Sequence, residues 1–210
     1  MPIKTNEREY RDLRLEIVQE PEDEKRMIVG GYASTFDHSY LIGYDFDDTK
    51  IMEQVDKTAF NESDMSDVIM QYDHAGRVFA RTRNNTLELN VDDIGLGIKA
   101  FLGGTELGRQ LYEDIQGGYI DRMSFGFVVD RSQDLWTEEA IDGEKVFLRT
   151  IRKIDKVFDV SAVSFPANDA TAISVRSLID GVNKEREAER LLKDLEIAKR
   201  KMEMKWRLSQ

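Results

Sequence analysis

Cysteine is absent from the sequence, and this absence excludes several kinds of site at once. The 210 residues contain no cysteine, which rules out disulfide frameworks, thiolate nucleophiles and zinc sites built from thiolates. Histidine is nearly as scarce, with two residues. Any chemistry that needs an imidazole as base or metal ligand therefore falls to His38 or His74.

Positive charge and long apolar runs are also in short supply. Lys and Arg total 30 against 41 Asp and Glu, a net charge of −11, so the chain lacks the basic surface that nucleic acids and anionic membranes attract. No run of about 18 apolar residues occurs, and the first residues, "MPIKTNEREYRDLRLEI", are polar and charged. We therefore expect a soluble, unsecreted protein that binds neither nucleic acid nor membranes.

What the sequence does contain is a series of short strand-like segments. Residues of the hydrophobic class make up 40% of the chain, enough for a core and too much for general disorder. β-Branched and alternating patterns predict strands at 13–17, 27–36, 67–72, 86–90, 95–102, 123–130 and 145–165. A short amphipathic helix is expected at 106–116, with Thr105 as its N-cap and Gly117 as its stop.

The composition changes near residue 178. The stretch "NKEREAERLLKDLEIAKRKMEMKWR" is rich in helix formers and in both signs of charge, without glycine or proline. We expect residues 1–177 to form a β-rich domain and residues 178–210 to form a charged amphipathic helix. That helix is either a solvated element or an arm that docks on a partner.

His74 is the better placed of the two histidines. It follows the apolar run "DVIMQY" directly after Asp73, at the end of a predicted strand, whereas His38 lies in a polar loop between Asp37 and Ser39 that favours a turn. By itself, a histidine after an aspartate is weak evidence for a catalytic base. Ser124 in "IDRMSFGF" is a candidate nucleophile for it, with Gly126 allowing another backbone to approach.

A third group must orient such a base. Asp159 in "VFDVSAVSF" is our first choice because its neighbours predict a buried strand, and a buried carboxylate needs a partner such as an imidazole N–H. Alternation would place Val157, Asp159 and Ser161 on one face of that strand. Asp155 ranks second. A surface salt bridge is the simpler explanation for either carboxylate.

Metal and cofactor sites find little support. Asp73 and His74 could recruit Asp92 or Asp93, yet neither an HExxH motif nor a second nearby histidine accompanies them. The stretch "GLGIKAFLGG" lacks the Lys-Ser or Lys-Thr ending of a phosphate loop, and its glycines fit bends in a barrel strand. We expect no metal and no cofactor.

Three segments together resemble a known family. "QYDHAGRVFART", "TELGRQLYEDIQGGYIDRMSFGF" and "KVFDVSAVSFPANDATAI" are similar to the signature blocks of the caudovirus prohead serine proteases, in family order and over residues 28–173. The resemblance implies a β-rich α+β fold, an assemblin-like β-barrel surrounded by helices, here with an extended charged C-terminal helix. It assigns the base to His74, the nucleophile to Ser124 and the third position to Asp159, where the family usually carries Glu.

The resemblance also implies what the protein would do. It points to a serine endopeptidase that cleaves scaffold and major capsid proteins inside the assembling prohead in the host cytoplasm, and that also cleaves itself. Oxyanion donors would come from backbone N–H groups near "FPANDA", with His74 Nε2 within hydrogen-bond reach of Ser124 Oγ. A homodimer or higher oligomer resembles assemblin behaviour. The alternative is a non-catalytic assembly factor of the same fold that binds scaffold through its C-terminal helix.

Overall fold

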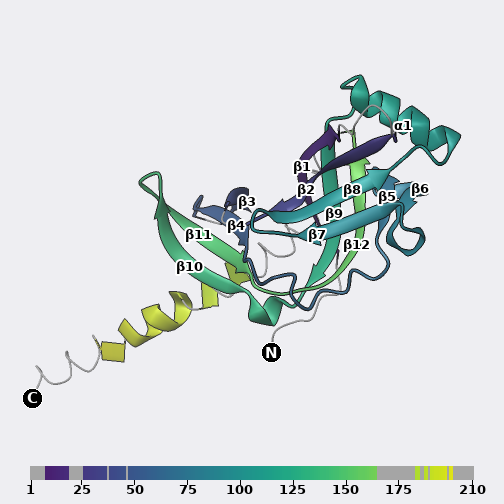
Figure 1. Cartoon of the computed structure of the whole chain (residues 1–210). Helices are drawn as coiled ribbons and strands as arrows, with labels where there is room; N and C mark the ends of the chain where they lie inside the picture. The colour runs from purple at the N-terminus through teal and green to yellow at the C-terminus, as the bar shows by residue number, and fades with distance from the viewer. Residues whose placement is uncertain are drawn as a thin grey trace, which may run out of the picture.

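Strands are the main secondary structure of the residues that the structure describes, as the sequence predicts. The computed structural model describes residues 8–18, 26–36, 38–45 and 47–164, together with 183–184, 187–188, 190–197 and 199–200. Its strands form two sheets, one of eight strands and one of four (Figure 1). The predicted β-rich α+β class is therefore confirmed.

The larger sheet curls into a nearly closed barrel. Its strand order is β6-β5-β12-β9-β1-β2-β8-β7. The edge strands β6 and β7 are in contact with each other, and the short 3-10 helix η1 (Thr82–Asn84) connects them along the chain. The bounds are β1 Glu9–Ile17, β2 Ile28–Thr35, β5 Ile69–Tyr72, β6 Ala75–Arg81, β7 Leu87–Val91, β8 Gly95–Phe101, β9 Arg122–Val129 and β12 Ile154–Val163.

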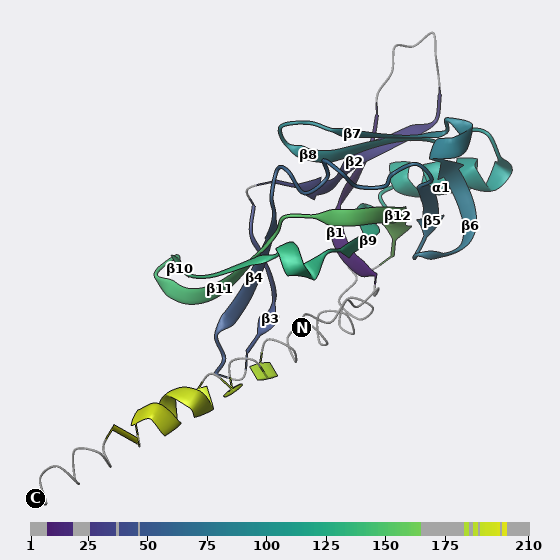
Figure 2. The same cartoon turned by 90° about the horizontal axis from the view of Figure 1, so that it is seen from below.

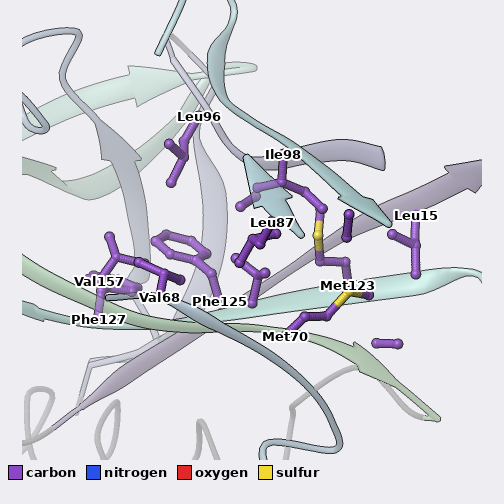
Figure 3. Close-up of a cluster of buried hydrophobic side chains, with 14 of the residues drawn as sticks. Leu15, Val68, Met70, Leu87, Leu96, Ile98, Met123, Phe125, Phe127 and Val157 are labelled. Carbon is purple, nitrogen blue, oxygen red and sulfur yellow. The ribbon is translucent and has the colours of Figure 1, made fainter. Parts of the chain in front are cut away.

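The apolar core lies on one face of this sheet. Met123, Phe125 and Phe127 alternate along β9 and are almost completely buried. Figure 3 shows them among side chains from the neighbouring strands, including Met70, Leu87, Leu96, Ile98 and Val157. Because side chains alternate along a strand, the residues between these, Ser124 among them, point to the opposite face.

Helix α1 (Glu106–Gln116) confirms the predicted helix. Thr105 is its N-cap, and the Thr105 hydroxyl accepts a hydrogen bond of 3.0 Å from the backbone N–H of Gly108. Leu111 and Ile115 are buried on one side, where the helix contacts β1. The helix ends directly before Gly117, and the following loop leads into β9 and Ser124.

The smaller sheet was largely missed by sequence analysis. It contains β10 (Leu135–Ile141), β11 (Glu144–Ile151), β4 (Lys50–Val55) and β3 (Tyr40–Tyr44), in the order β10-β11-β4-β3. We predicted a polar loop where β3 lies, and one long strand where β11 and β12 are separate strands of different sheets. Figure 2 shows this sheet beside the barrel, on the side away from α1.

A buried cluster of charges joins the two sheets. Arg149 of β11 contacts Glu9 of β1 at 2.8 Å and Glu53 of β4 at 2.6 Å. Arg11 of β1 binds the same Glu53 carboxylate through Nε at 2.6 Å and through Nη2 at 2.8 Å. Arg149 is fully buried and also contacts Asp134 at 2.7 Å. These long-range pairs give each charge that the two sheets bury between them a partner of opposite sign.

The C-terminal segment is helical wherever the structure describes it, at 183–184, 187–188, 190–197 and 199–200. The predicted domain boundary near residue 178 lies outside the described residues. Within the described part of the chain, no helix is both long and apolar enough to span a bilayer.

Candidate active site

His74 occupies a tight turn at the end of β5. Tyr72 of β5 pairs with Ala75 of β6, which leaves Asp73 and His74 as the two loop residues of a hairpin. Their φ angles are 48° and 55°, as a type I′ turn requires at both central positions. A histidine in this left-handed region costs about 1 kcal/mol or more, so surrounding contacts must hold it there.

Asp73 provides one of these contacts. Its carboxylate accepts hydrogen bonds from the backbone N–H of Ser164 at 2.8 Å and from the Ser164 hydroxyl at 3.0 Å. The Asp73 N–H also donates to the carbonyl of Ala162 at 2.9 Å. These contacts join the turn to the end of β12, and Asp73 serves as a turn residue.

The second contact joins His74 to Asp159. Nδ1 of His74 lies 2.5 Å from Oδ1 of Asp159, across 85 residues of sequence. The Asp159 side chain is 2% exposed and that of His74 is 13% exposed. With Nδ1 directed at the carboxylate, a reacting group would meet the imidazole at Nε2, which is also buried.

Ser124 lies on the same face of the larger sheet as Asp159. It is fully buried and pairs directly with Ser161 of β12, while Gly126 pairs with Asp159. Directly opposed residues of antiparallel strands share a face, so the Ser124 side chain points to the side that carries Asp159. The Ser124 hydroxyl makes no hydrogen bond in the described structure, so the expected bond to His74 Nε2 is not present.

A β-bulge in β12 corrects one expectation. The register with β9 shifts between Val157 and Asp159, and Val157 belongs to the apolar core instead of sharing the face of Asp159 and Ser161. A bulge inserts one extra residue and reverses the alternation beyond it. The buried carboxylate thus follows an apolar segment yet points away from the core.

The other candidates lie apart from this arrangement. Asp155 and His38 are exposed. Asp92 accepts hydrogen bonds from the Tyr32 hydroxyl and from the backbone of its own loop, and among the described residues no group of three acidic or histidine side chains could hold a metal. The "FPANDA" segment at 165–170 lies outside the described residues.

Ser161 was missed as a residue of this site. Its hydroxyl donates to Oδ1 of Asp159 at 2.9 Å. A serine two residues after a buried aspartate on one strand was the available signal, because residues at i and i+2 share a face. The site thus combines a buried serine, a partly buried imidazole oriented by a carboxylate, and a second hydroxyl on that carboxylate. A hydroxyl, an imidazole and an orienting carboxylate are the side chains that acyl transfer to a serine uses.

Comparison with known proteins identifies the family of the chain. A family model described as caudovirus prohead serine protease matches residues 14–185, a range that includes His74, Ser124, Asp159 and Ser161. Searches of curated proteins and of solved structures gave no match. The matched range covers most of the chain, and the chain belongs to the caudovirus prohead serine protease family.

Proposed function

We propose that this protein is a serine endopeptidase that cleaves scaffold and major capsid proteins inside the assembling prohead. Ser124 is the nucleophile, His74 the general base and Asp159 the group that orients the base. The observation that carries the proposal is the 2.5 Å contact between His74 and Asp159, on the same sheet face as a buried serine without a hydrogen bond. Membership of a serine protease family supports the same assignment.

Acylation uses all three side chains. His74 Nε2 takes the proton from the Ser124 hydroxyl as Oγ attacks the carbonyl carbon of the peptide. The tetrahedral intermediate collapses, the C–N bond breaks, and the imidazolium gives its proton to the departing amine. Asp159 stays ionised, holds the tautomer with the proton on Nδ1, and stabilises the imidazolium while it exists.

Deacylation repeats these steps with water. His74 takes a proton from a water molecule, whose oxygen attacks the ester carbonyl. Collapse of the second intermediate breaks the bond to Ser124 Oγ and returns a proton to it from His74. The carboxylic acid product leaves, and the enzyme regains its starting state.

Two further features complete the proposal. The protein also cleaves its own chain, and it acts as a homodimer or a higher oligomer. Self-cleavage is proposed from the resemblance to the family, and oligomerisation from the resemblance to the assemblins. Neither alters the roles of the three side chains.

Co-expression with the scaffold and coat proteins of the same phage tests the activity. Wild type is expected to give shortened scaffold and coat chains, whereas Ser124→Ala leaves them at full length while shells still assemble. Ser34→Ala is the matched control, because Ser34 is a buried serine of β2 in the same sheet outside the site; it should cleave as wild type does.

Intact masses of all chains are the measurement, and they also report self-cleavage. Cleavage by Ser124→Ala at the wild-type sites would refute the assignment of the nucleophile. A non-catalytic assembly factor predicts assembled shells with full-length chains for wild type and for both variants.

A further inference from the structure

We infer that Ser161 is a positioning residue, which holds the Asp159 carboxylate in the orientation that meets His74. The inference rests on the proposed function, because it assigns Ser161 a role in the same reaction. It concerns a residue that touches none of the reacting atoms and would act through Asp159 alone.

The contacts of Asp159 support this role. Oδ1 of Asp159 accepts from the Ser161 hydroxyl at 2.9 Å and lies 2.5 Å from Nδ1 of His74. Among the residues that the structure describes, these two side chains supply the hydrogen bonds to the carboxylate. Asp159 is 2% exposed and Ser161 is fully buried, so bulk water does not replace a donor that is removed. Hydrogen bonds to a charged group are among the stronger ones in proteins.

The backbone of Ser161 is fixed from both sides. It pairs with Ser124 of β9 on one side and with Gln71 of β5 on the other. The terminal torsion of an aspartate is broad, so a carboxylate with one partner samples many orientations. A second donor from a rigid strand narrows that range, and the position of the imidazole follows the carboxylate.

The hydrogen bonds also separate the roles of the two opposed serines. The hydroxyl proton of Ser161 is donated to Asp159, whereas the hydroxyl of Ser124 makes no hydrogen bond in the described structure. A nucleophile must give its proton to the base. Ser124 suits that step, and Ser161 suits the support of the carboxylate.

A double-mutant cycle tests whether Ser161 acts through Asp159. The substrate is a peptide that spans a junction cut in the co-expression experiment. Ser161→Ala is expected to lower kcat about 10- to 100-fold with KM within about twofold, as loss of a hydrogen bond to a charged group predicts. In an Asp159→Asn background the same change should lower kcat no further, because its effect passes through the carboxylate.

Two further variants serve as controls. Ser34→Ala, the buried serine of β2, should keep the wild-type kcat. Ser161→Thr keeps the hydroxyl and should restore most of the rate that Ser161→Ala loses. The added methyl group of threonine must fit a fully buried position, which affects the rate independently of the hydroxyl. The double-mutant cycle therefore decides whether the inference holds. Equal fold-losses from Ser161→Ala in both backgrounds would overturn the inference.

Nuclear magnetic resonance gives a readout that needs no turnover. The chain has two histidines, so ¹⁵N-labelled histidine gives two ring systems, and His38→Gln identifies that of His74. We expect a slowly exchanging Nδ1 proton on His74 in wild type and in Ser34→Ala, and a faster exchanging one in Ser161→Ala. Identical exchange in Ser161→Ala would contradict the inference.

The two proposals fail in different ways. If Ser124→Ala still cleaves, the proposed nucleophile is wrong, whatever the histidine resonances show. If Ser124→Ala is inactive but Ser161→Ala changes neither kcat nor proton exchange, the enzyme assignment stands and the positioning role is rejected.

Discussion

At the scale of single residues, burial separates the carboxylates that sequence alone leaves as alternatives. Asp159 and Asp155 lie four residues apart in one strand, yet Asp159 is buried against His74 and Asp155 is exposed. The apolar neighbours of Asp159 predicted its burial correctly. Its partner His74 is 85 positions away. Sequence analysis proposed this pair from the pattern around each residue and from the family resemblance, but only the fold gives the contact itself.

Asp159→Asn is expected to fold normally and to lower kcat about 10³- to 10⁴-fold, because the amide no longer holds the Nδ1-protonated tautomer. Asp155→Asn is the matched control and should keep kcat within about twofold. Peptide turnover by both variants, with circular dichroism to verify folding, is the measurement. Wild-type turnover by Asp159→Asn would exclude this carboxylate as the orienting group.

At the scale of elements, the site depends on two local irregularities. The β5–β6 hairpin places His74 in a left-handed turn without the Asn-Gly pair that marks such turns in sequence. The bulge in β12 turns Asp159 and Ser161 away from the core. β5 lies within a predicted strand and β12 within a longer one, whereas β6 was not predicted. Both irregularities depend on pairing with other strands, which a local pattern does not show.

Sequence analysis missed strands in which a buried charged residue, paired with a distant residue, stands where an apolar residue would be expected. β3 and β4 carry Tyr40 and Glu53, which meet through a hydrogen bond of 2.6 Å from the Tyr40 hydroxyl to the Glu53 carboxylate. A buried glutamate in a strand gives a polar pattern that resembles a loop. Helix α1, whose cap and apolar stripe are local, was predicted within its observed bounds.

At the scale of the whole molecule, the buried charges hold the barrel and the smaller sheet together. Three acids meet three bases at this junction: Glu9, Glu53 and Asp134 against Arg11, Arg131 and Arg149. Burial raises the pKa of the Glu9 carboxyl, but the charges of Arg149, Arg11 and Arg131 and the hydrogen bond from Arg149 together outweigh burial and lower the pKa from 4.5 to about 2. A charged Glu9 therefore stabilises the folded state.

This lowered pKa predicts how stability depends on pH. Between pH 4.5 and 2 the unfolded chain binds a proton at Glu9 that the folded chain does not, so the stabilisation is present above pH 4.5 and is lost as pH falls toward 2. The free energy of unfolding of wild type should fall by about 3 kcal/mol more than that of Glu9→Gln over this range. Urea unfolding followed by tryptophan fluorescence measures both, and parallel curves would contradict the prediction.

The most direct test of the central claim is covalent labelling of the native protein with a fluorophosphonate, followed by mass spectrometry of its peptides. A serine activated by a neighbouring imidazole reacts with such a reagent far faster than an ordinary hydroxyl does. The account predicts a single adduct on Ser124, present in Ser34→Ala and absent in His74→Ala. No adduct, or an adduct on another residue such as Ser161, would contradict it.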